Sequence, residues 1–183
     1  MPPAKSASRG YAGGQGVVGV KALIVVESIW GNTEAIAVAI GAGLGAGAEV
    51  VRIDAAPDVL PAGLDLLVVG GPTHAFSMSR VDTRKAAKDQ GATRVPRLGI
   101  REWIGKLGTP PRGTRVATFD TRSVAPRLPG SAAKKAMKRL VKLGYEPLAA
   151  AESFGVYGYS GPLEEGEVAR AEQWGRTLAG RLA

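Results

Sequence analysis

Residues 27–33 read ESIWGNT and directly follow KALIVV at residues 21–26, a run that is apolar after its first residue. An uninterrupted apolar run of this length is typical of a strand that is covered on both faces. The small and polar residues after it lead at once into apolar residues at helical spacing. Two interpretations fit this turn: Ser28, Asn32 and Thr33 cap the helix, or they form a cradle for a phosphate.

The composition excludes several classes of protein. The chain has 183 residues, of which 45% are hydrophobic, enough for one domain with a sizeable core. With no cysteine and one histidine, His74, it has no disulfide framework, no thiolate metal site and no histidine-rich metal centre. No apolar run approaches the ~20 residues of a membrane helix, and the N-terminus lacks a signal-peptide core. We therefore predict a cytoplasmic protein with a disordered arm over residues 1–17 and one domain over residues 18–183.

Positive charge is concentrated in the middle of the chain. The formal net charge is +8, yet residues 80–139 contain 16 Lys and Arg against 4 Asp and Glu, a net of +12. Two interpretations fit: this region attracts an acidic partner, or it is an ordinary solvated surface. No basic helix with interleaved aromatic residues is present, so we predict no nucleic-acid partner.

Five apolar runs of strand length alternate with helical patterns. This alternation predicts an α/β fold in three layers, a doubly wound five-stranded parallel sheet with helices on both faces. Ser131 is expected to cap the helix before the last strand, and Gly144 to end it. Residues 76–97 are basic and weakly periodic, and we predict a long functional or mobile loop there. The five runs span residues 20–26, 49–53, 64–69 and 114–119 and part of residues 148–157.

Ligands of open parallel sheets bind beyond the carboxyl ends of the strands. Three segments follow predicted strands there: ESIWGNT, GGPTHAF at residues 70–76 and DTRSVAPRLPG at residues 120–130. In the first, Ser28 and Thr33 offer hydroxyl groups, Gly31 allows close backbone approach and Asn32 offers an amide. The segment is neither a Walker loop nor a Gly-x-Gly-x-x-Gly fingerprint.

Together these motifs resemble the flavodoxin-like family, whose members bind FMN. The family's phosphate loop ends in Gly-Asn-Thr, as residues 31–33 do, and its second flavin loop often carries Gly-Pro-Thr, as residues 71–73 do. The third flavin loop is placed at residues 119–122 by order only. The resemblance implies strand order 2-1-3-4-5 and bound FMN. The implied FMN-binding residues are Ser28, Ile29, Trp30, Gly31, Asn32, Thr33, Pro72, Thr73, His74, Phe76, Asp120, Thr121 and Arg122.

The sequence also departs from the usual flavodoxin pattern. The third segment has no tyrosine to stack on a flavin, residues 74–76 include no glycine, and the protein is basic rather than acidic. Tyr157 and Tyr159 are assigned a structural role, and Trp30 either packs the turn or shields the flavin.

Three functions fit these residues. The first is an electron carrier that uses non-covalently bound FMN. The second is an FMN-dependent NAD(P)H:quinone-type reductase, in which the arginines of residues 76–97 form a site for a nicotinamide nucleotide. The third is a flavin-free interaction module on the same fold. The predicted partners are FMN and a redox partner with an acidic surface, and the protein is expected to be a monomer or a homodimer.

Overall fold

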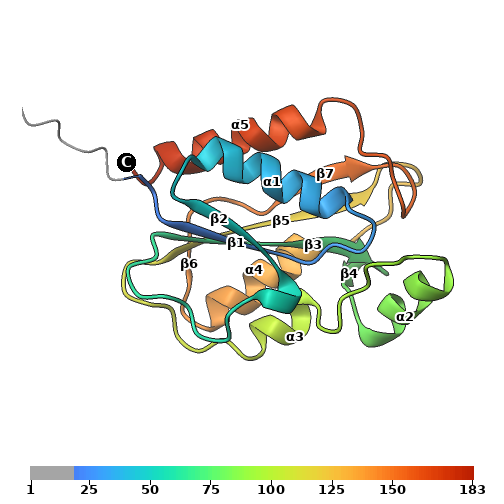
Figure 1. The fold of residues 1–183 in the computed structure, drawn as a ribbon, viewed down its shortest axis with the longest axis horizontal. Helices are drawn as coiled ribbons and strands as arrows, with labels where there is room; N and C mark the ends of the chain where they lie inside the picture. Colours follow the sequence, from blue (N-terminus) through green and yellow to red (C-terminus); the bar gives the residue numbers. More distant parts are fainter. Residues whose placement is uncertain (1–18) are drawn as a thin grey trace, which may run out of the picture.

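The computed structural model describes residues 19–183, and the predicted N-terminal arm lies outside the described residues (Figure 1). Strands and helices alternate along the chain, as the apolar periodicity predicts. Among the described residues, none of the helices has the length and apolar character needed to cross a membrane. The elements are β1 (Ala22–Val26), α1 (Asn32–Leu44), β2 (Ala48–Arg52), a short 3-10 helix (Ile53–Ala55), β3 (Leu66–His74), β4 (Ser77–Met78), α2 (Val81–Asp89), α3 (Ile100–Ile104), β5 (Arg115–Ser123), α4 (Ala132–Lys142), β6 (Glu146–Pro147), β7 (Glu152–Val156) and α5 (Glu167–Gly180).

The sheet has the order β2-β1-β3-β5-β6, and β7 pairs with β5 beyond β6. All these pairs are parallel, which confirms the predicted order 2-1-3-4-5 for the five strand positions. The described residues form seven strands in this sheet, whereas five were predicted. The fifth position is divided into β6, which pairs at the start of β5, and β7, which pairs at its end. The remaining strand, β4, folds back antiparallel on the end of β3.

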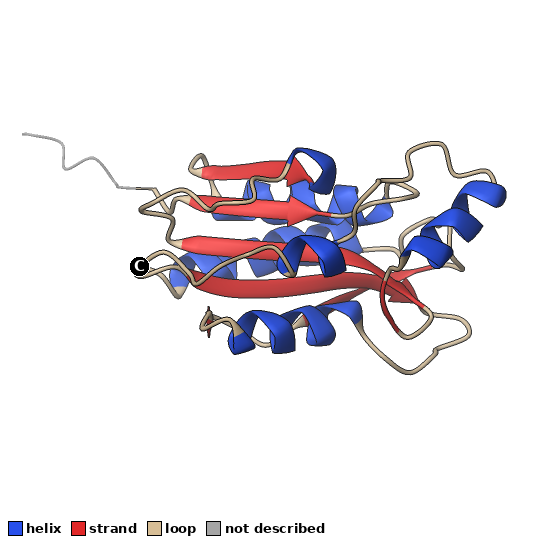
Figure 2. Cartoon of the chain, turned by 90° about the horizontal axis from the view of Figure 1, so that it is seen from below, coloured by secondary structure: helices blue, strands red, loops and turns tan. Residues whose placement is uncertain are grey.

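Helices cover both faces of the sheet, so the fold has three layers (Figures 1 and 2). Ile24 and Val26 of β1 belong to the core on the α1 and α5 side. Leu23 and Val25 belong to the core on the α3 and α4 side, which also contains Trp103. Because successive side chains of a strand point to opposite faces, β1 must be apolar throughout, and each of its residues is buried.

Helices α1 and α5 approach closely through two glycines. A Cβ atom at Gly43 would overlap the carbonyl oxygen of Glu172, and one at Gly175 would overlap the carbonyl oxygen of Ile40. Gly45, with φ at 98°, ends α1. The glycine-rich segment at residues 41–47 is therefore a helix end and a packing surface.

The second and third flavin loops implied by the resemblance, at residues 71–73 and 119–122, lie within β3 and β5. β3 and β5 extend side by side past β1, with Gly71 opposite Asp120 and Pro72 opposite Thr121. The polar residues that follow the apolar runs are thus fixed by strand pairing. The predicted loop at residues 76–97 was wrong in large part, because it contains β4 and α2.

Two predicted signals of α4 are confirmed. The Ser131 hydroxyl accepts a hydrogen bond from the backbone N–H of Lys134 at 3.1 Å, so Ser131 caps the helix. Gly144 follows the last turn with φ at 96°, the left-handed conformation that commonly ends a helix.

Candidate functional site

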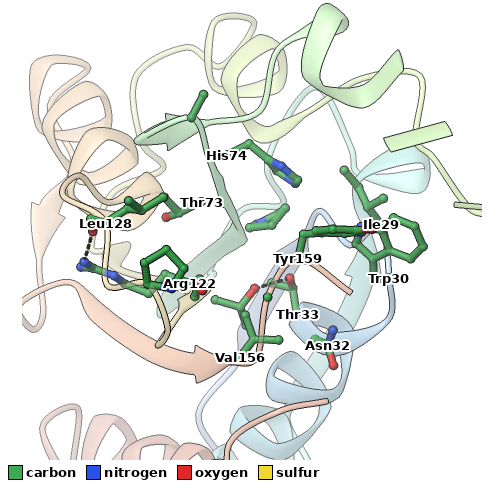
Figure 3. A pocket seen from close by; sticks show the side chains of 16 residues that line it. Ile29, Trp30, Asn32, Thr33, Thr73, His74, Arg122, Leu128, Val156 and Tyr159 are labelled. Atoms are coloured by element: carbon green, nitrogen blue, oxygen red, sulfur yellow. Dashed lines mark hydrogen bonds between the residues drawn. The ribbon is translucent and has the colours of Figure 1, made fainter. Parts of the chain in front are cut away.

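A pocket with a cavity volume of about 310 Å³ opens at the carboxyl ends of β1, β3, β5 and β7 (Figure 3). Its position matches the rule for ligands of open parallel sheets, and its volume is in the range of small-ligand sites. All three predicted segments contribute to the lining. The lining residues are Ile29, Trp30, Asn32, Thr33, Pro72, Thr73, His74, Ala75, Thr121, Arg122, Ser123, Pro126, Leu128, Val156, Gly158 and Tyr159.

The turn at residues 28–33 is folded by Ser28. Its hydroxyl oxygen accepts hydrogen bonds from the backbone N–H groups of Gly31 and Glu34, both at 3.2 Å. Gly31 has φ at 94°, in the left-handed region that favours glycine. Ser28 is buried, and neither residue lines the pocket. They shape the loop, and the Ser28 hydroxyl that was expected to face a phosphate is occupied by the loop itself.

Asn32 and Thr33 form the first turn of α1 at the edge of the pocket. Among the described residues, no acceptor binds their backbone N–H groups, which is the usual condition of a helix N-terminus and a favourable setting for an anion. The Thr33 hydroxyl lies 2.8 Å from the Thr121 hydroxyl, and the Asn32 side chain donates to the carbonyl of Ser160 at 3.0 Å. Ser28 therefore caps the turn, as the first interpretation predicts. Asn32 and Thr33 offer backbone amides at the pocket edge, and the phosphate cradle stays a prediction.

Negative charge beside this loop is neutralised. Glu34, in the first turn of α1, lies 2.6 Å from a guanidinium nitrogen of Arg52 and 3.4 Å from one of Arg94. Arg52 also donates to the carbonyl of Ser28 at 3.1 Å. Among the described residues, no carboxylate lines the pocket, and Arg122 is the one charged residue that does. The electrostatic setting of the described residues thus favours an anionic ligand.

Trp30 and Tyr159 form an aromatic wall of the pocket (Figure 3). Their ring centroids are 5.5 Å apart and their planes are inclined by 55°. The indole Nε1 of Trp30 is buried and has no hydrogen-bond partner among the described residues. Tyr159 was predicted to have a structural role, and its place in the pocket lining was not predicted. The signal available in the sequence was an aromatic residue directly after Gly158, beyond the last strand.

His74 ends β3 and lies opposite this wall (Figure 3). Its Nε2 is buried without a partner among the described residues. Burial lowers the pKa of His74 below 6.5, and the Arg84 cation lowers it further, so the imidazole is neutral at pH 7. The next residues, Ala75 and Phe76, have φ at 44° and 69° and form the turn to β4. Phe76 is 50% exposed and does not line this pocket, so its ligand contact stays a prediction.

Asp120 lies beneath the pocket and does not line it. It is fully buried, and its Oδ2 accepts hydrogen bonds from the hydroxyl groups of Thr73 and Ser131 at 3.0 and 2.5 Å and from the backbone N–H of Ala133 at 3.0 Å. Asp120 therefore fixes the start of α4 against the end of β3. Its other oxygen, Oδ1, has no partner among the described residues.

Arg122 lines the pocket from β5, but its guanidinium is engaged elsewhere. It donates to the carbonyl of Leu128 at 2.7 Å (Figure 3). This hydrogen bond holds the connection between β5 and α4 along one side of the pocket.

The arginines of residues 76–97 do not line the pocket, and the nicotinamide site stays a prediction. Within the described residues, the lining includes no residue from 77 to 97. Arg84 is buried and lies 3.1 Å from a carboxylate oxygen of Glu102. Arg94 is bound to Glu34. These arginines connect α2 and the segment after it to the rest of the fold.

Comparison with known proteins shows the fold. No protein-family model matches the chain, and no curated protein matches its sequence. Solved structures with similar folds include flavodoxin 1 from Bacillus cereus (17% identity, TM-score 0.62, covering 88% of this chain and 99% of that one) and a flavodoxin from the domain Archaea (14%, 0.59, 88% and 97%). A third is a diflavin flavoprotein A3 from Nostoc (16%, 0.51, 88% and 93%). The chain therefore has the flavodoxin-like fold.

Proposed function

We propose that this protein binds FMN non-covalently in the pocket and functions in electron transfer. The observation that carries the proposal is a set of polar groups around one cavity that have no hydrogen-bond partner among the described residues: two backbone amides at the start of α1, the Trp30 indole N–H and the His74 Nε2. Similar structures named as flavodoxins and as a flavoprotein support it.

These residues fit the chemistry of FMN. A phosphate is held best by backbone amides at a helix N-terminus, and Asn32 and Thr33 supply such amides where no carboxylate lines the pocket. A flat ring system requires aromatic neighbours, which Trp30 and Tyr159 supply. Buried unpaired polar groups cost about 1–3 kcal/mol each, so an acceptor on a ligand would stabilise the indole N–H of Trp30, and a donor or acceptor would stabilise the His74 Nε2.

When bound, FMN would supply the redox chemistry, and the protein would position it and exclude water. The neutral His74 would donate or accept a hydrogen bond without adding charge at pH 7. The aromatic pair would cover one side of the site. The hydrogen bonds of Asp120 and Arg122 would keep the walls of the site fixed.

Titration with FMN, FAD and riboflavin, followed by quenching of flavin fluorescence, tests the proposal. We expect FMN to bind most tightly, because the pocket has one phosphate cradle and no dinucleotide fingerprint. Riboflavin binding as tight as FMN binding would contradict the phosphate assignment, and failure of all three flavins to bind would refute the function. Bleaching of the bound flavin by NADPH without an added reductase would identify an enzyme rather than a carrier.

A further inference from the structure

A second hollow, with a volume of about 300 Å³, lies between β4, α3 and α4 and is lined by positive charge. Within the described residues no carboxylate lines it, and none of its cations forms an ion pair. We call it the basic groove, and its cations are Arg80, Arg101, Lys135, Lys138, Arg139 and Lys142.

Four of these cations form one row along α4. They occur at positions i, i+3, i+4 and i+7, which share one face of a helix, and all four are exposed. The row is about 10 Å long, from the helical rise per residue. Like charges at these spacings destabilise a helix. The opposite face of α4 is fixed in the core by Ala136 and Leu140, so the row faces solvent as a unit.

Arg101 closes the groove from α3 in a fixed position. Its guanidinium donates to the carbonyl groups of Met78 and Ser79 at 2.8 and 3.1 Å, and Arg139 donates to its backbone carbonyl at 3.3 Å. Burial lowers the pKa of Arg101, and the cations of Arg139 and Arg80 lower it further. The Glu102 carboxylate raises the pKa of Arg101, but this carboxylate is already paired with Arg84. The groove thus concentrates positive charge that the protein itself does not neutralise.

We propose that the basic groove is the docking surface for an acidic protein partner, whose carboxylates pair with the row on α4 and with Arg101. Of the described residues that line it, one is apolar, Met78, and none is aromatic, so the lining offers no platform on which a nucleotide base would stack. Carboxylates on alternate residues of an extended segment are about 7 Å apart, so two of them would fit within the ~10 Å of the row.

The groove adjoins the proposed flavin site through one hairpin. Ser77 and Met78 line the groove and pair with His74 and Thr73, which line the pocket. A partner in the groove would therefore contact the wall of the site where electrons would be exchanged. This link rests on the proposed function, whereas the binding of an acidic chain to the groove does not.

Fluorescence anisotropy with a labelled polyglutamate peptide tests the groove directly. The double variant Lys138→Glu with Lys142→Glu should lower affinity about tenfold and weaken its salt dependence. The control, Lys85→Glu with Lys88→Glu, makes the same change of charge on exposed positions of α2 outside the groove and should retain affinity within about twofold. Equal losses in the two double variants would overturn the proposal.

Two further arms separate the alternatives. The first arm uses a single-stranded oligonucleotide of equal charge. If it binds more tightly than polyglutamate and loses that affinity in the Lys138→Glu with Lys142→Glu variant, the partner of the groove is a nucleic acid and not an acidic protein. The milder variant Lys138→Gln with Lys142→Gln should show a smaller loss in the same direction, with an unchanged unfolding midpoint. FMN titration of each variant keeps the two proposals apart, because the groove variants should bind FMN as the unaltered protein does.

Discussion

The pair of hydroxyl groups on Thr33 and Thr121 gives the sharpest test of how the site is built. These side chains are 3% and 4% exposed, and their oxygens are 2.8 Å apart. Thr33→Val keeps the shape and the β-branch of the side chain, so helix propensity is nearly unchanged. It removes one hydroxyl and leaves that of Thr121 buried without its partner. We expect this variant to lose about 1–3 kcal/mol of unfolding free energy.

The double variant Thr33→Val with Thr121→Val removes both hydroxyl groups. Replacing both partners by apolar groups of the same shape can be nearly neutral, so the double variant should be more stable than the sum of the two single losses predicts. A coupling free energy of about 0.5–3 kcal/mol is expected between residues in contact. Urea unfolding of the four proteins measures it. Strictly additive losses would refute the hydrogen bond between these two side chains.

The same four proteins test the phosphate assignment. If the Thr33 hydroxyl turns to the phosphate of FMN, its loss removes a hydrogen bond to a charged group, about 1.5–3 kcal/mol, or about 10- to 100-fold in affinity. Thr121→Val should change FMN affinity by less, because Thr33 keeps its hydroxyl. Equal affinity in all four proteins, together with lower stability of the single variants, would show that Thr33 only fixes α1 to β5.

Three other changes have clear expected outcomes. Gly175→Ala should cost about 1–3 kcal/mol of stability, because its methyl group would overlap the carbonyl of Ile40; a normal unfolding midpoint would contradict the close approach of α1 and α5. Ser131→Ala should cost about 1–2 kcal/mol in urea unfolding, since it removes the cap of α4 and a donor to Asp120; unchanged stability would show that the cap adds nothing. Burial raises the pKa of Glu27 above 4.5 and outweighs its hydrogen bonds, so its contribution to stability is full below pH 4.5 and falls as the pH rises through the raised pKa. Glu27→Gln should remove this decline when unfolding is followed from about pH 4 to about pH 8, and an unchanged pH profile would contradict it.

The positions of the main strands and helices could be predicted because their signals are local, whereas the strand order followed from the resemblance to the flavodoxin-like family. A short, uninterrupted apolar run such as β1 is recognised as a strand buried on both faces from its own residues. Ser131 and Gly144 mark the two ends of α4 through backbone geometry that involves few distant residues. Such features need no knowledge of which strands are neighbours.

The lengths of β3 and β5 could not be predicted, because they depend on pairing between distant segments. Pro72 and Asp120 are typical of loops, yet each lies opposite a residue of the neighbouring strand. α2 was missed for a different reason. Its buried side chains are Arg84 and Ala87, so the helix has no apolar stripe that a periodicity search detects.

The candidate site was predicted in part for the same reasons. Many residues that line the pocket lie in the segments that the motifs mark, as Asn32 and His74 do, whereas Val156, Gly158 and Tyr159 lie beyond them. Chemistry alone did not distinguish them from Ser28, whose hydroxyl oxygen is used inside the protein, or from Asp120, whose Oδ2 is. A polar residue at a strand end is equally suited to bind a ligand or to fix the backbone that surrounds it, and tertiary contacts determine which of the two it does.

The excess of positive charge over residues 80–139 is likewise resolved by its partners. Arg84, Arg94 and Arg115 each pair with a glutamate, and Arg122 donates to a backbone carbonyl. Among the described residues, none of the cations of the basic groove pairs with a carboxylate, although Arg101 and Arg139 donate to backbone carbonyls. The groove therefore gathers part of this charge on one face of the molecule, while other cations, such as Lys85 and Lys88, are exposed outside it. An attraction that acts from one face orients an approaching acidic surface, and it weakens beyond the ~8 Å over which salt screens charge at physiological ionic strength. The groove would thus orient an acidic surface only at short range. At that range, the hairpin of β3 and β4, which lines both the groove and the pocket, keeps the docked surface close to the pocket.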